Sequence, residues 1–202
     1  YLSDAMAIPK HPLCVSPDAQ REHLTIALSN APSAGHIVEC GVFQGWTLNH
    51  LASLQPHRTV WGFDSFYGLP VFWDDNHPKG HFSLDGKPPE VLPNVRLEIG
   101  LFADTIPVWL AANPGNIAFL HVDCDIYSST IDILFGLNDR LIPGSIVSFD
   151  DMHEFENVGP NPPGKWRSEE WIGMEEWAQR FNRQFSVVSR IYQCCMSIRI
   201  LT

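Results

Sequence analysis

Residues 117–130 read IAFLHVDCDIYSST. The apolar run at residues 117–120 is typical of a strand that is covered on both faces, as in a parallel sheet between helix layers. Two carboxylates, Asp123 and Asp125, follow it, although aspartate is a poor strand former and a buried unpaired charge is costly. This stretch therefore predicts a central strand whose end carries polar groups with a function.

Similar apolar runs recur along the chain with helical stretches between them. The alternation predicts βαβ units, right-handed crossovers and a parallel sheet in an α/β fold. The expected strands are residues 36–42, 59–66, 95–100, 117–124 and 145–151, and the expected helices are residues 46–54, 103–112 and 128–140.

The pattern changes after residue 167. Residues 168–181 predict a helix capped by Ser168 with acidic residues in its first turn. Two strand-like runs follow at 185–192 and 196–201, and because no helix fits between them we expect an antiparallel hairpin.

Residues 1–34 are expected to form an N-terminal helical segment, in which Ser16 caps a helix that starts at Pro17. Residues 68–93 and 152–167 are rich in turn-forming residues and are predicted to be irregular. Long loops in a compact domain are commonly lids or binding loops, so both are candidate substrate loops. The length of 202 residues suits a single domain, 1–202.

Composition excludes several classes of protein. Lys plus Arg number 13 against 23 Asp plus Glu, a formal net charge of −10 that disfavours a nucleic-acid partner. No apolar run approaches the roughly 18 residues of a membrane span, so no membrane partner is expected. The five cysteines match no zinc motif, and Cys40 and Cys124 lie in apolar runs as buried free thiols. We expect a reducing, cytoplasmic location.

The first predicted strand leads into the glycine turn of residues 39–47, ECGVFQGWT. Gly41 and Gly45 permit a tight turn and the close approach of a ligand to a helix N-terminus. Glu39, just before this turn, suits an amino group on the ligand rather than a phosphate. Asp64 ends the second strand about 20 residues further on, where an acid can reach ribose hydroxyls.

Four carboxylates are expected at one edge of the sheet, because Asp123 and Asp125 follow one strand and Asp150 and Asp151 follow the next. Ligands bind outside the carboxyl ends of such strands. Hard oxygen ligands suit Mg²⁺ or another divalent cation, which would also compensate the clustered charge.

Five blocks together resemble the class I S-adenosylmethionine-dependent methyltransferases, and within them the TylF-type, macrocin O-methyltransferase-like group. The blocks are ECGVFQGWT (39–47), WGFDSFYGLP (61–70), GLFADTIP (100–107), HVDCDIYSST (121–130) and SFDD (148–151). The resemblance runs from about residue 35 to the final strand-like run. It implies a Rossmann-like, seven-stranded sheet, mostly parallel with a C-terminal antiparallel hairpin and helices on both faces.

The resemblance also implies roles for individual residues. The methionine part of S-adenosylmethionine would be bound by Glu39, Gly41, Gly45 and Thr47. Its ribose would be bound by Asp64, with Ser65 and Phe66 beside it, and its adenine would be lined by Gly100, Leu101 and Phe102. Asp123 would also lie beside the cofactor. The metal ligands would be Asp123, Asp150 and Asp151, and the catalytic pair Asp125, as general base, and Asp123.

The expected activity is transfer of a methyl group to a hydroxyl of a small molecule, whether a sugar, a phenol or a polyketide-type natural product. The metal would lower the pKa of the hydroxyl, and Asp125 would accept its proton, with His121 and His153 as alternative bases. Two other hypotheses are a metal-dependent hydrolase that uses the aspartate cluster and a catalytically silent S-adenosylmethionine-binding protein. The sequence is compatible with a homodimer as well as with a monomer.

Overall fold

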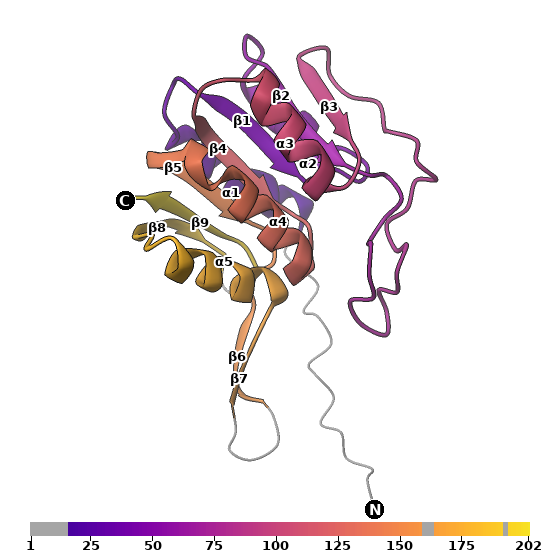
Figure 1. Cartoon of the computed structure of the whole chain (residues 1–202), viewed down its shortest axis with the longest axis vertical. Coiled ribbons are helices and arrows are strands. Elements are labelled where there is room, and N and C mark those ends of the chain that lie inside the picture. Colours follow the sequence, from indigo (N-terminus) through magenta and orange to yellow (C-terminus); the bar gives the residue numbers. More distant parts are fainter. Residues whose placement is uncertain (1–15, 159–163, 192–193) are drawn as a thin grey trace, which may run out of the picture.

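The computed structural model of the chain describes residues 16–158, 164–191 and 194–202. A seven-stranded sheet runs through its centre in the order β3-β2-β1-β4-β5-β9-β8 (Figure 1). The first five strands in this order pair in parallel, and β9 pairs antiparallel with both β5 and β8. The strands are β1 His36–Cys40, β2 Val60–Asp64, β3 Val95–Ile99, β4 Ile117–Val122, β5 Leu141–Phe149, β8 Phe185–Arg190 and β9 Met196–Ile200.

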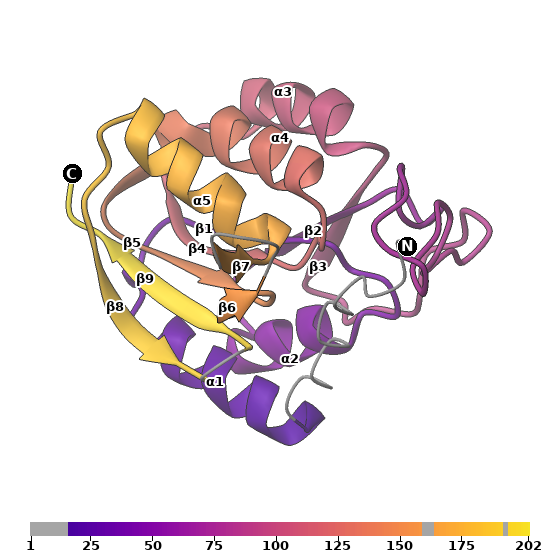
Figure 2. The ribbon, with the colours of Figure 1, turned by 90° about the horizontal axis from the view of Figure 1, so that it is seen from below.

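Helices cover both faces of this sheet. Figure 2 shows α1 and α2 on one face and α3, α4 and α5 on the other. Their bounds are α1 Pro17–Ser29, α2 Trp46–Leu54, α3 Phe102–Ala112, α4 Tyr127–Leu137 and α5 Glu169–Arg180, with a short 3₁₀ helix, η1, at Asn138–Arg140. The predicted alternation of strands and helices and the antiparallel hairpin are thereby confirmed.

The two helix layers explain why the central strands are apolar throughout. Successive side chains of a strand point to opposite faces, and here each face has its own core. In β1, Ile37 packs with the α1 and α2 layer and Val38 with the opposite layer; in β4, Phe119 and Leu120 divide in the same way. A polar residue in such a strand is therefore buried whichever way it points.

One predicted loop contains regular structure. Residues 152–167 were expected to be irregular, but β6 Glu154–Val158 and β7 Gly164–Arg167 pair as an antiparallel ribbon that projects from the sheet (Figure 1). The prediction was wrong because the Gly and Pro residues that the sequence places between these strands hid two short strand-forming runs. The residues 159–163 between them lie outside the described ones.

The other irregular segment is as predicted: between β2 and β3, residues 68–93 hold only an isolated bridge between Asp74 and His77. In the N-terminal segment, α1 begins at Pro17 and Ser16 Oγ accepts the N–H of Ala19 at 3.3 Å, which confirms the cap. Residues 1–15 of that segment lie outside the described residues.

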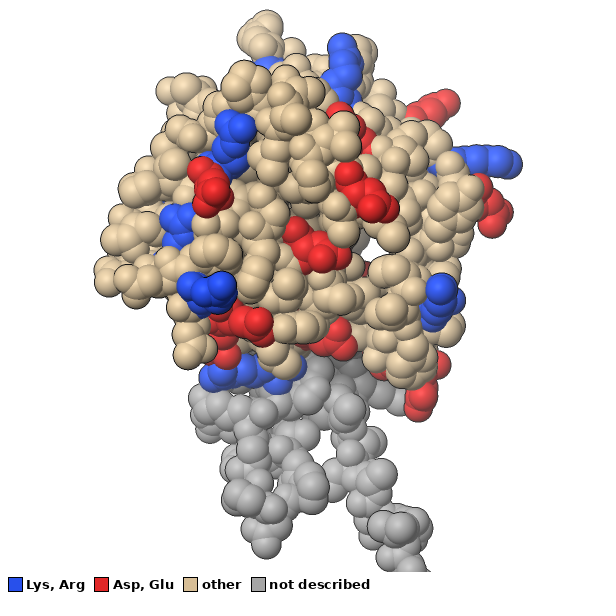
Figure 3. All heavy atoms as spheres, viewed as in Figure 1, with Lys and Arg blue, Asp and Glu red and all other residues tan. Residues whose placement is uncertain are grey.

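The thiols of Cys40 and Cys124 are free and buried, as predicted. Within the described parts of the chain, no helix is both long and apolar enough to cross a bilayer. Figure 3 shows acidic and basic side chains interspersed over the face seen in Figure 1.

Candidate active site

One cleft opens beside the carboxyl ends of β1, β2, β3 and β4, and it gathers residues that the sequence singled out in four separate blocks. Asp64, Asp123 and Asp125 reach it from different strand ends, so the predicted cofactor and catalytic residues share one space. Its lining contains, of the predicted residues, Gly41, Asp64, Ser65, Gly100, Leu101, Phe102, Asp123 and Asp125. Glu39, Gly45, Thr47, Phe66, Asp150 and Asp151 are not part of this lining.

The glycine turn is shaped by the neighbouring strand. Gly41 has φ +95°, and a Cβ at this position would lie 1.6 Å from the carbonyl oxygen of Asp123. Gly45 has φ +77° and precedes the first residue of α2. The end of β4 therefore approaches the backbone at Gly41 closely, which is a reason for this glycine that the sequence did not reveal.

Asp64 holds the two loops that border the cleft. Its Oδ2 accepts the N–H groups of Val42 and Phe43 at 2.8 Å each, and its Oδ1 accepts the N–H of Phe66 at 2.8 Å. Phe43 and Phe66 have φ +45° and +58°, a backbone region that costs energy for residues other than glycine. Asp64 thus stabilises a strained wall of the cleft, and its predicted contact with ribose stays a prediction.

Glu39 is fully buried and faces another side chain of the protein. Register pairs it with His121 on β4, and its Oε2 lies 2.8 Å from Nδ1 of His121. Burial raises the pKa of Glu39, and the hydrogen bonds of His121 and Thr47 partly oppose that rise. The predicted contact of Glu39 with an amino group of a ligand also stays a prediction.

The aspartate cluster separates into two groups. Asp123 and Asp150 lie together with His121, and one ligand atom from each of these three residues falls within 4.8 Å of the others. Oδ1 of Asp150 accepts hydrogen bonds from Nε2 of Gln20 at 2.6 Å and from Sγ of Cys195 at 3.3 Å. Burial first, and then the negative neighbours Asp150 and Asp151 respectively, raise the pKa of Asp123 and Asp150.

This group fits a divalent cation. Nε2 of His121 is buried and has no hydrogen-bond partner among the described residues. A bound cation would give this nitrogen a partner, and it would compensate the charge of the two carboxylates whose pKa is raised.

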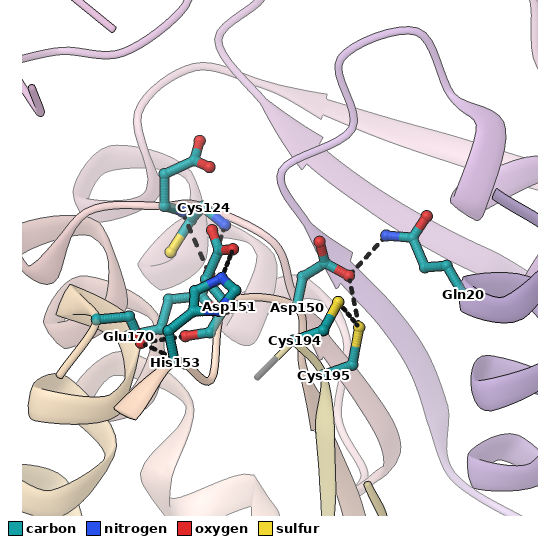
Figure 4. Close-up of polar contacts among 10 residues, drawn as sticks. Gln20, Cys124, Asp150, Asp151, His153, Glu170, Cys194 and Cys195 are labelled. Atoms are coloured by element: carbon teal, nitrogen blue, oxygen red, sulfur yellow. Dashed lines mark hydrogen bonds and ion pairs between the residues drawn. The ribbon is translucent and has the colours of Figure 1, made fainter. Parts of the chain in front are cut away.

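Asp151 lies in the second group, although it follows Asp150 directly. Its Oδ1 lies 3.1 Å from Nε2 of His153, and together with burial its negative charge raises the pKa of Asp125. Figure 4 shows Asp150 with Gln20 and Cys195, and Asp151 with His153 and Glu170. Asp151 is thus not in the group that Asp123 and Asp150 form, and its metal-ligand role stays a prediction.

Glu170 organises both strand ends, and the sequence reading missed this. Its Oε1 accepts the N–H groups of Cys124 at 2.9 Å and Asp125 at 3.2 Å, and its Oε2 accepts that of Asp151 at 3.1 Å. Ser168, which precedes α5 as predicted, donates its hydroxyl to the carbonyl of Asp151 instead of capping its own helix. The only signal in the sequence was an acid in a first helical turn.

The general-base candidate, Asp125, is held tightly. It has φ +66°, and its N–H is bound by Glu170. Burial, and then the charge of Asp151, raise the pKa of Asp125 well above its usual range. A carboxylate with raised proton affinity that lines the cleft is suited to accept a proton there.

Residues 90–169 match the family model of the macrocin O-methyltransferase (TylF). Over this segment the chain is similar to that family. The match covers α3, β4, α4 and β5, and with them the aspartates at the ends of β4 and β5. The resemblance stated from the sequence is thereby confirmed.

Curated relatives in this group are O-methyltransferases of natural products. The 8-demethyl-8-(2,3-dimethoxy-alpha-L-rhamnosyl)-tetracenomycin-C 4'-O-methyltransferase of Streptomyces olivaceus is 34% identical over 140 residues, 58% of this chain and 52% of that protein. The mycinamicin III 3''-O-methyltransferase of Micromonospora griseorubida is 30% identical over 145 residues, 58% of this chain and 55% of that protein. The chain spans about half the length of the curated relatives it matches.

Among solved structures, the O-methyltransferase NovP superposes with a TM-score of 0.64 over 92% of this chain and 79% of that chain, at 22% identity. A likeness at this level of identity shows the fold. It confirms the predicted class I methyltransferase sheet, mostly parallel with an antiparallel hairpin at residues 185–200.

Proposed function

We propose that the chain is the catalytic part of an S-adenosylmethionine-dependent O-methyltransferase that acts on a hydroxyl of a sugar-bearing natural product. The observation that carries this proposal is that Asp64, Asp123 and Asp125 line one and the same cleft. The names of the two relatives, O-methyltransferases of a rhamnosyl-tetracenomycin and of mycinamicin III, support the substrate class.

The cofactor side of the cleft runs from the glycine turn to the end of β3. Asp64 would bind ribose hydroxyls with the lone pairs that its three backbone donors leave free, and residues 100–102 would line the adenine. When bound, S-adenosylmethionine supplies an electrophilic methyl group. Placing that group in line with the acceptor oxygen is the main contribution expected from the residues of this side.

The metal side lies at the ends of β4 and β5. Asp123 and Asp150 would hold a divalent cation, with Asp151 as the third ligand predicted from the sequence. A cation at this place supplies Lewis acidity toward the acceptor oxygen. Gln20 and Cys195 bind one oxygen of Asp150 and so fix the orientation of its carboxylate.

Asp125 would accept the proton of the acceptor hydroxyl as the oxygen gains the methyl group. It lines the cleft beside Asp123, and its raised pKa narrows the gap in proton affinity between a carboxylate and an alcohol. Burial and then the neighbouring charge of Asp151 cause this rise in the pKa of Asp125.

The acceptor would meet the loop between β2 and β3. Leu69, Pro70 and Phe82 of this loop line the cleft, and the ring of Phe82 packs edge-on against Phe43 with 5.3 Å between centroids. Apolar side chains at this rim can cover the face of a sugar or an aromatic ring and exclude water.

The test is formation of S-adenosylhomocysteine with a panel of hydroxylated glycosides, with wild type compared with Asp125→Asn. The variant should lose about 10²–10⁴-fold in kcat, while calorimetry shows unchanged S-adenosylmethionine binding. Full turnover by Asp125→Asn would remove the base assignment. Hydrolysis without S-adenosylmethionine, or cofactor binding with no product from any acceptor, would support the hydrolase or the silent binding protein, neither of which the comparisons favour.

A further inference from the structure

The two ring nitrogens of the buried His121 have different surroundings. Nδ1 lies 2.8 Å from a carboxylate oxygen of Glu39, and both side chains are buried. Nε2 is buried too, but no described residue forms a hydrogen bond with it. A buried polar atom without a partner destabilises the folded chain, because it has lost its hydrogen bonds to water. A role in packing alone therefore leaves Nε2 unexplained.

Glu39 prepares this nitrogen for a ligand. The register of β1 against β4 pairs Glu39 with His121, so the backbone fixes their contact. With Glu39 ionised, Nδ1 carries the proton and donates it to the carboxylate, and Nε2 presents its lone pair. Histidines that bind metals in proteins commonly donate their other N–H to a carboxylate in this way.

The ring of His121 lies beside two carboxylates. Asp123 is two residues beyond His121, and Asp150 reaches the same place from the end of β5. The ligand atoms of these three residues lie within 4.8 Å of one another. Gln20 and Cys195 bind only Oδ1 of Asp150, so Oδ2 is left for another partner.

We propose that Nε2 of His121 is a metal ligand together with Asp123 and Asp150, and that this site prefers a transition metal such as Mn²⁺ or Co²⁺ over Mg²⁺. Imidazole suits transition metals, whereas Mg²⁺ favours oxygen ligands and water. The set differs from the all-oxygen set expected from the sequence, in which His121 was an alternative base. The inference rests on the cation site of the proposed function, but its test requires no methyl transfer.

The experiment uses the full chain, stripped of metal and loaded with Mn²⁺, without S-adenosylmethionine or acceptor. Pulsed electron paramagnetic resonance detects a nitrogen nucleus bound directly to Mn²⁺. Nitrogen modulation is expected in the wild type and should be lost in His121→Gln. Calorimetry should show about a 10–100-fold weaker affinity for Mn²⁺ in this variant, with little change for Mg²⁺.

His153→Gln is the matched control, because His153 is the buried histidine that contacts Asp151 in the other group. It should keep the nitrogen modulation, and Glu39→Gln should keep it with weaker Mn²⁺ binding. Absence of modulation in the wild type overturns the proposal whether or not any variant folds. Modulation that persists in His121→Gln, or that disappears in His153→Gln instead, overturns it as well. An inactive protein that shows the nitrogen signal would count against the proposed function alone.

Discussion

Glu170 accepts the backbone N–H of Cys124 at 2.9 Å, across a gap of 46 residues in the sequence. The same side chain also binds the N–H groups of Asp125 and Asp151, so one buried carboxylate of α5 ties together the ends of β4 and β5. The aspartates at both strand ends are therefore positioned by the protein itself. Such positioning in advance of binding is what a site needs to act on charge that develops during a reaction.

Glu170→Gln should destabilise the chain by about 1–3 kcal/mol. The amide NH₂ of glutamine would face a backbone N–H, so at least one of the three donors loses its acceptor. Urea denaturation measures the change. Glu169→Gln is the control, because Glu169 accepts only the N–H of Tyr127 among the described residues and an amide oxygen can replace it. Equal losses in the two variants would contradict the bridging role.

Gly41→Ala should be far more damaging than Gly80→Ala. Both glycines have positive φ, +95° and +83°, so both variants carry a similar backbone cost of about 1–2 kcal/mol. Only at Gly41 does the new Cβ meet another group, the carbonyl oxygen of Asp123, whereas nothing lies within 4 Å at Gly80. Thermal denaturation should show a loss above about 4 kcal/mol for Gly41→Ala alone. Similar melting temperatures would mean that β4 does not approach the turn this closely.

Asp64→Asn should weaken S-adenosylmethionine binding by about tenfold or more. Asparagine has one acceptor oxygen and cannot hold Val42, Phe43 and Phe66 together as both oxygens of Asp64 do. Isothermal titration calorimetry measures the affinity. Asp74→Asn is the matched control, because Asp74 also accepts backbone N–H groups, from Asn76 and His77, but is not part of the cleft lining. If both variants bind the cofactor like wild type, Asp64 does not shape its site.

His23 should make the chain sensitive to acid. Burial, and then the charge of His121, lower the pKa of His23 from 6.5 to about 4. Between these values the unfolded state binds the proton and the folded state does not, so the free energy of unfolding falls as the pH falls. His23→Gln can still donate to Ser197, which His23 contacts at 2.8 Å, but it does not titrate.

Between neutral pH and a pH of about 4, the wild type should lose about 1–3 kcal/mol more than His23→Gln. Urea denaturation at a series of pH values gives both curves. The buried carboxyl groups of the site titrate in both proteins, so their contributions cancel in the difference. Parallel curves would show that His23 has an ordinary pKa in the folded state.

The strands of the central sheet, the hairpin and the edge of the sheet that holds the cleft could be predicted, because each depends on a local sequence pattern. Continuous apolar runs marked the parallel strands, and the missing helix between 185–192 and 196–201 marked the antiparallel hairpin. Polar residues at strand ends marked the cleft, because the ends of parallel strands meet at one edge of the sheet. The placement of Asp64, Asp123 and Asp125 in one cleft followed from this. The single domain, the cytoplasmic location and the homodimer stay predictions.

Local sequence patterns could not predict the contacts between segments that are distant in the sequence. Two adjacent aspartates, Asp150 and Asp151, look alike in sequence, but neighbouring side chains leave the backbone in different directions and meet different partners. The pairing of Glu39 with His121 depends on strand register, and the bridge made by Glu170 depends on how α5 docks. No spacing along the chain encodes either one.

The carboxylate of Asp150 is held from both sides by segments that are remote in sequence: Gln20 lies 130 positions away and Cys195 lies 45 positions away. Ring closures of this length form late and slowly during folding, because the entropy of the intervening chain must be lost first. A chain in which the sheet has formed around β4 but α1 or β9 has not yet docked would hold Asp150 loosely. Capture of a metal ion during refolding should therefore lag behind the recovery of helical circular dichroism.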